Sequence, residues 1–166
     1  MAGLGASDCE HPSGGMLAQP VNAVTGLGLV AAGGWIIARS LRRSQRRAGT
    51  LAFGASVVAA GTGSVLYHGP QPSYAKAVHD LSIVAVLSQV AVYELAHRRR
   101  GAVPEPRAYA TALASIGLGA AAYALGRTSS PLCDPGSVLQ LHGAWHLLAG
   151  LSLAAYARAR LESPTR

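Results

Sequence analysis

The stretch Leu141-His142-Gly143-Ala144-Trp145-His146 lies inside the last long apolar run of the chain, Val138 to Ala157. Residues four positions apart lie on the same side of a helix, about one turn from each other. An ionisable ring in so apolar a segment is costly unless it has a partner. The two histidines therefore need partners from elsewhere in the chain, and the pair can serve in packing, in haem binding or in metal binding.

The rest of the chain consists of further apolar blocks. Half of its 166 residues are hydrophobic and 13% are charged, which is about half the charged fraction of an ordinary soluble domain. A helix needs about 20 residues to cross a bilayer. Five runs approach that length, and the third does so only by including Tyr74 to Asp80; they are Val21–Ala38, Ala48–Tyr67, Leu81–Ala96, Ala108–Leu125 and Val138–Ala157.

These runs predict an all-α integral membrane bundle of about five transmembrane helices. The bundle is expected to form a single domain over residues 20–160, after an N-terminal segment, 1–19, and before a tail, 161–166. The predicted helices span residues 20–39, 48–68, 74–97, 107–126 and 135–158.

The basic residues are distributed unevenly between the predicted loops. Twelve of the 14 Lys and Arg residues fall on one side of the membrane, and only Lys76 and Arg127 fall on the other. Basic loops stay on the cytoplasmic side, so the N-terminus is predicted outside and the C-terminus inside, in a multi-pass protein of the cell membrane. The net charge of +7 is therefore a topology signal that also suits anionic lipid heads, and no nucleic-acid partner is expected.

This topology brings polar side chains of three helices to one face of the membrane. Ser64, His68, Asp80, His142 and His146 all lie within roughly three turns of the outer face. Three neutral imidazoles are a complete protein ligand set for catalytic zinc, with the fourth position open. A nearby carboxylate, Asp80, suits acid/base chemistry, and the hydroxyl of Ser64, one turn before His68, suits polarisation of a carbonyl.

Other interpretations of these residues stay open. Intramembrane histidines often serve in packing or in interhelical hydrogen bonds, and two histidines on facing helices can hold a haem. The haem interpretation leaves Asp80 and Ser64 without a role. His79 is expected to face away from its neighbour Asp80 and to lie at the interface, and Glu94 is expected in a salt-bridged helix end at the opposite face.

Several motifs, in order, resemble the alkaline ceramidase family. They are Gly-x-Gly-Ser-x-x-x-His at 61–68, an Asp at 80 near the start of the third helix, and His-x-x-x-His at 142–146. Asp8-Cys9-Glu10, followed by Gln-Pro-Val-Asn-Ala at 19–23, is similar to the family's N-terminal segment. The family belongs to a superfamily of seven-helix membrane hydrolases that includes the progestin and adipoQ receptors and the Per1-like proteins.

The resemblance implies a hydrolase that cleaves the N-acyl bond of a ceramide-like membrane lipid to a fatty acid and a lipid amine. It implies that His68, His142 and His146 bind Zn²⁺, that Asp80 is the acid/base, and that Ser64 assists at the carbonyl. It also implies a disulfide between the two cysteines of the chain, Cys9 and Cys133.

The chain departs from the family in two respects. Five helices are predicted instead of seven, with two missing between the third and the last, so a thinner bundle must enclose the site with fewer walls or form a homo-oligomer. Of the residues that hold calcium in the family, Glu10 alone fits, because Asp8 is displaced, Pro12 replaces an Asn and Gln19 stands where an acid is expected. Calcium therefore has little support. Three functional alternatives remain: a non-catalytic receptor or structural protein pinned by zinc, a haem-binding membrane protein, and a small transporter. The transporter is disfavoured, because the predicted helices other than 74–97 carry no acidic residue.

Overall fold

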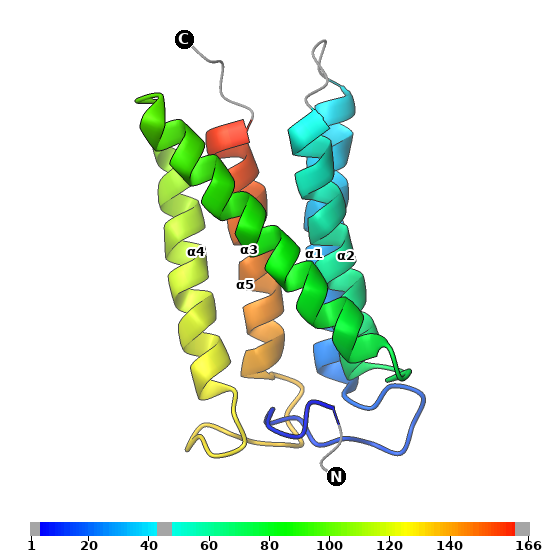
Figure 1. Cartoon of the computed structure of the whole chain (residues 1–166). Helices are drawn as coiled ribbons and strands as arrows, with labels where there is room; N and C mark the ends of the chain where they lie inside the picture. Colours follow the sequence, from blue (N-terminus) through cyan, green and yellow to red (C-terminus); the bar gives the residue numbers. More distant parts are fainter. Residues whose placement is uncertain (1–3, 43–47, 162–166) are drawn as a thin grey trace.

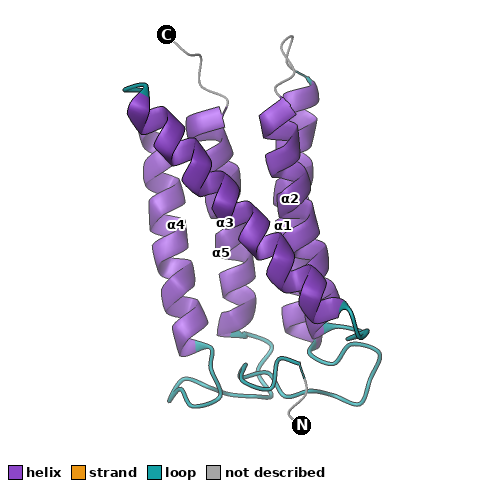
Figure 2. Cartoon of the chain, viewed as in Figure 1, coloured by secondary structure: helices purple, strands orange, loops and turns teal. Residues whose placement is uncertain are grey.

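The computed structural model of the chain describes residues 4–42 and 48–161. Within these ranges it is helical, with one isolated bridge pair, Asp8 and Arg127, and no strand. Figure 2 shows that loops are confined to the N-terminal segment and to the connections. This confirms the predicted all-α class. The helices are α1 (Pro20–Leu41), α2 (Ala48–His68), α3 (Ala75–Arg99), α4 (Pro106–Leu125) and α5 (Leu141–Tyr156), which continues into a π-helical turn, Ala157–Leu161 (Figure 1).

Four of these helices, α1 to α4, are long and apolar enough to cross a membrane. This agrees with the predicted membrane bundle. The α-helical part of α5 has 16 residues, which is short of the roughly 17–25 that a span requires. Only together with the π-helical turn does it run over 141–161, so a fifth crossing stays a prediction.

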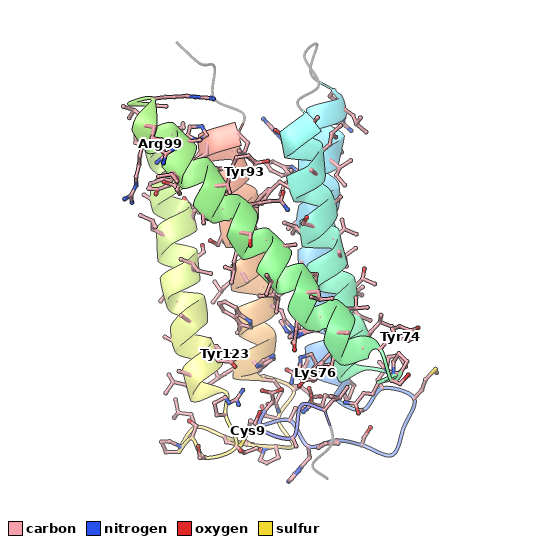
Figure 3. The ribbon with its side chains drawn as sticks, viewed as in Figure 1. Cys9, Tyr74, Lys76, Tyr93, Arg99 and Tyr123 are labelled. Carbon is pink, nitrogen blue, oxygen red and sulfur yellow. A yellow bond between two sulfur atoms is a disulfide. The ribbon has the colours of Figure 1, made fainter. Side chains whose placement is uncertain are left out.

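The two ends of the bundle differ in chemistry. The N-terminal segment, with Cys9, lies at one end, and Arg99 at the end of α3 lies at the other (Figure 3). The π-helical turn that follows α5 lies on that second side too (Figure 1), which we call the arginine end. Which end faces the cell interior stays a prediction. Four arginines of the predicted inner clusters, Arg43, Arg46, Arg47 and Arg166, lie outside the described residues.

The helices pack as a chain of neighbours rather than as a closed ring. α1 packs against α2 and α5, α2 packs against α3, and α4 packs against α5. Glycine allows close backbone approach in the α1–α2 pair, because a Cβ on Gly33 would lie 2.6 Å from the backbone nitrogen of Val58. Small residues at helix contacts are the usual means of packing in lipid. α3 crosses the bundle diagonally, in front of α4 and α5 (Figure 1).

α5 begins six residues later than predicted, at Leu141 instead of residue 135. Asp134 and Pro135 are residues that suit the N-cap and the first position of a helix. Instead, Asp134 forms a turn in which its carboxylate accepts a bond from the amide of Gly136, and the side chain of Gln140 donates to the carbonyls of Asp134 and Ser137. Asp134 and Pro135 therefore lie in a loop and do not start the helix, because that loop is tied to the N-terminal segment.

At the arginine end, an ion pair between buried Arg160 and half-buried Glu94 joins α3 to the end of α5. Arg160 donates from Nε and Nη2 to the carboxylate of Glu94 at 2.9 and 2.8 Å and from Nη1 to the carbonyl of Ala102 at 2.8 Å. Its guanidinium also lies over the ring of Tyr109. The salt-bridged helix end predicted at Glu94 is therefore present, and it joins α3 to the end of α5.

Replacing Arg160 by alanine is expected to destabilise the bundle by about 3 kcal/mol, because a half-buried Glu94 carboxylate would lose its partner. Arg158 is two residues away and exposed, so Arg158→Ala is the matched control. Thermal unfolding in detergent micelles measures both variants. Equal melting temperatures would show that the pair contributes nothing to stability.

Candidate metal site

Three histidines meet at the end of the bundle that carries the N-terminal segment. His68 is the last residue of α2, and His142 and His146 lie on the first turns of α5. All three are buried, and one ligand atom from each lies within 4.8 Å of the others. The ring centroids are 4.8 to 5.2 Å apart. The structure thus brings together the three predicted zinc ligands and shows that they can hold a metal ion.

The outer hydrogen bonds of two of these rings leave one nitrogen of each for a metal. Nδ1 of His68 lies 2.6 Å from Oε1 of Gln19, and Nδ1 of His146 lies 3.1 Å from the carbonyl oxygen of Asn22. Nε2 of His68 is buried and has no hydrogen-bond partner among the described residues. A buried polar atom without a partner is costly, so the donor set fits a cation such as Zn²⁺, which imidazole nitrogens bind well.

The two predicted catalytic residues line the cavity in front of the histidines. Ser64 is buried on α2, one turn before His68. Asp80 lies on the first turns of α3, is half exposed, and forms an ion pair with Lys76. The structure therefore places both side chains at the cavity, and their roles in catalysis stay predictions.

His79 does not face away from Asp80 as predicted. Its Nδ1 lies 2.8 Å from Oδ1 of Asp80, and its ring stacks on Tyr67 with a centroid distance of 4.6 Å. Adjacent side chains leave a helix about 100° apart, but the imidazole is long enough to reach back to the carboxylate. His79 and Asp80 therefore form a pair at the mouth of the cavity.

Asp8 also belongs to this site, although the sequence did not predict it there. The Asp8 carboxylate is only 4% exposed, and its oxygens lie 3.3 Å from Nδ1 of His142 and 3.9 Å from Nδ1 of His68. Arg127 forms an ion pair with it at 3.1 Å. Burial raises the pKa of Asp8 to about 6, against the opposing effect of the Arg127 guanidinium. The one signal in the sequence was its position next to Cys9, because the expected disulfide to Cys133 would bring the N-terminal segment close to the start of α5 and its histidines.

The expected disulfide between Cys9 and Cys133 is present. It joins the N-terminal segment to the loop between α4 and α5. The amide of Cys9 donates to the carbonyl of Gly126 at 2.9 Å, and the amide of Thr128 donates to the carbonyl of Ser7 at 3.1 Å. The N-terminal segment therefore lies across the histidine end of the bundle and is fixed there by a covalent link and by backbone bonds.

Glu10 has a structural task in this segment. Its two carboxylate oxygens accept bonds from the amides of Val21 and Asn22 at 2.7 and 2.8 Å. A carboxylate at this position satisfies free amides of the first helical turn and interacts favourably with the helix dipole. The residue that best matched the calcium pattern thus caps α1.

A cavity of about 450 Å³ leads away from the histidines. Its floor follows α5 from His142 to Leu153, a distance of about 16 Å at the helical rise per residue. Its polar groups gather at the histidine end, and the remaining walls are apolar side chains of α1 to α5, including Leu29, Ala60, Ile83, Val86, Leu87, Ile116, Trp145 and Ala149. A cavity of this form suits a molecule with a polar end and a long apolar part.

No family model, curated protein or solved structure matches the chain. The likeness to the ceramidases therefore stays a resemblance of motifs.

Proposed function

We propose that this protein is a membrane-embedded, zinc-dependent hydrolase that cleaves the N-acyl bond of a ceramide-like lipid. The observation that carries the proposal is the buried cluster of His68, His142 and His146 at the head of a largely apolar cavity. A site of three histidines is typical of catalytic zinc. The amide class of the substrate rests on the resemblance to the ceramidases, and the lipid class rests on the cavity and the apolar helices.

Each of the surrounding residues has a task in such a reaction. When bound, zinc supplies a water of lowered pKa and polarises the substrate carbonyl. The hydroxyl of Ser64 donates a hydrogen bond to the carbonyl oxygen, where negative charge develops. Asp80 takes a proton and returns it to the leaving amine. His79, hydrogen-bonded to Asp80, holds that carboxylate in place beside the cavity.

The arrangement of α3 and α4 supports entry of the substrate from the bilayer. α3 packs on α2 and α4 packs on α5, whereas α3 and α4 make few contacts with each other. Both line the cavity, α3 through Ile83 and Leu87 and α4 through Ile116. By the resemblance, the two helices missing from the seven-helix pattern fall between the third helix and the last, which agrees with entry of an acyl chain between α3 and α4.

Replacing Ile116 by tryptophan is expected to lower kcat/KM for a long-chain acyl amide about tenfold. The larger side chain would displace roughly two methylene groups of the acyl chain from the cavity. A short-chain substrate should be much less affected. Leu118→Trp is the matched control, since Leu118 lies on α4, is exposed and is not among the residues that line the cavity. Equal losses for both chain lengths would contradict the proposed binding mode.

A non-catalytic role for the metal is the second candidate, and one observation favours it. α2 and α5 pack far less extensively than α2 does on α1 or α5 does on α4, so a metal between His68 and the two α5 histidines would join two weakly packed elements. A haem is disfavoured, because imidazole rings whose centroids are at most 5.2 Å apart are in direct contact. No macrocycle fits between them.

Metal analysis combined with turnover tests these functions. The purified full-length protein should contain about one zinc per chain, as a three-histidine site requires, and should release fatty acid from a panel of acyl amides. Zinc without turnover on any acyl amide or acyl ester would support the structural role. A protein that neither contains zinc nor takes it up would exclude both, and a visible absorption spectrum would detect a haem.

A further inference from the structure

Asp8 is the buried carboxylate closest to the three histidines. It comes from the N-terminal segment, outside the helices, and is 4% exposed. Burying a carboxylate is costly unless cations and hydrogen-bond donors surround it. Arg127 supplies the cation at 3.1 Å from Oδ1, and Nδ1 of His142 lies 3.3 Å from the same oxygen. Asp8 therefore bridges Arg127 and a candidate metal ligand.

The fold holds Asp8 in this position from several directions. Cys9, the next residue, is tied to Cys133 by the disulfide, and the backbone of residues 7–9 is hydrogen-bonded to residues 126–128. Gly126 allows the loop to pass close to α5, because a Cβ there would lie 2.7 Å from the backbone nitrogen of His142. Arg127 is itself held by the hydroxyl of Tyr123, at 3.2 Å, and by the face of its ring. Such support is typical of a residue that must be placed accurately.

The three histidines share one pattern of outer partners. Nδ1 of His68 meets Gln19, and Nδ1 of His146 meets the carbonyl of Asn22. Nδ1 of His142 is buried, has no hydrogen bond among the described residues, and lies 3.3 Å from the carboxylate of Asp8. All three partners come from residues 8–22. Metal-binding histidines usually donate their second ring N–H to a carboxylate or a carbonyl, which fixes the tautomer and the orientation of the ring.

We propose that Asp8 is the positioning residue of His142: its carboxylate accepts the Nδ1–H of that ring and turns Nε2 toward the metal. This inference rests on the metal site of the proposed function. It also assigns a task to the disulfide and to Arg127, which together hold the acceptor in place. The covalent link thereby connects the N-terminal segment to metal affinity.

Zinc affinity of the purified full-length protein tests this role, measured by competition with a chromophoric chelator. Asp8→Ala is expected to weaken zinc binding by about 10- to 100-fold, the usual cost of losing an outer partner of a metal ligand. Co²⁺ bound in place of zinc should show an altered visible spectrum in the variant, because the spectrum follows ligand geometry. Asp134→Ala is the matched control: Asp134 also adjoins a disulfide cysteine but is exposed, so zinc affinity and spectrum should not change.

A second variant guards against a folding defect. Asp8→Leu combined with Arg127→Met removes both charges of the pair, a replacement that is often neutral for stability, and it should weaken zinc binding as much as Asp8→Ala does. Wild-type affinity and spectrum in either folded variant would overturn the proposal while leaving the metal site intact. A wild-type protein that binds neither zinc nor Co²⁺ would overturn the proposed function, and this inference with it.

Discussion

Replacing His142 by alanine is expected to reduce the zinc content of the purified protein from about one ion per chain to less than about 0.1, because two protein ligands do not retain the ion through purification. His142 is buried, and its ring lies within 5 Å of both other imidazoles (centroid distances of 4.9 Å to His68 and 4.8 Å to His146). Among the described residues, the group that can hold a metal ion consists of His68, His142 and His146. Elemental analysis of the protein after gel filtration measures the loss.

Stability should change together with metal content. Zinc at about 100 times its Kd stabilises a folded protein by about 2.7 kcal/mol if the unfolded chain does not bind it. The wild-type protein should therefore melt at a higher temperature with zinc than with a chelator, and His142→Ala should show no difference. His97→Ala is the matched control, because His97 lies at the arginine end, where its Nδ1 bonds to the carbonyl of Tyr93. Full zinc content in His142→Ala, or equal loss in His97→Ala, would contradict the site.

The helices could be predicted from the sequence wherever local signals decide them. α2 has the predicted bounds, Ala48–His68, because an apolar run of spanning length meets Gly69 and Pro70, which stop a helix. The start of α5 could not be predicted in this way. Asp134 and Pro135 form a good local start signal, but the disulfide at Cys133 and the bonds of Gln140 hold the loop open as far as Leu141.

The same distinction applies to the site. The histidines could be predicted because the helix ends and the charge asymmetry set their depth in the membrane. That depth places polar residues of three helices near the same membrane face. Asp8 could not be predicted, because it reaches the site through pairing with Arg127, which is 119 positions away in the chain. Residues in a polar, Gly-rich tail carry no periodicity from which a position could be derived. The neighbouring cysteine was the one link to the fold.

Asp80 poses a different question, because its environment allows both a catalytic and a structural role. It lines the cavity beside Ser64 and His68, as an acid/base residue should. It also pairs with Lys76 one turn earlier on α3, and half-exposed pairs of this kind contribute little to stability. A catalytic role therefore predicts a large loss of activity with little loss of stability, and a structural role predicts small changes in both.

Asp80→Asn is accordingly expected to lower kcat for acyl-amide hydrolysis by about 10²- to 10⁴-fold, the usual contribution of a general acid/base, with zinc content and melting temperature unchanged. Lys76→Met removes the other half of the ion pair and should change kcat less than fivefold, since it leaves the carboxylate in place. His79→Gln should lower kcat by a smaller factor than Asp80→Asn. Because residues that act as one unit are not additive, the Asp80→Asn/His79→Gln double variant should be no slower than Asp80→Asn alone. A fully active Asp80→Asn protein would remove the acid/base role, and additive losses would show that His79 acts independently of the carboxylate to which it is hydrogen-bonded.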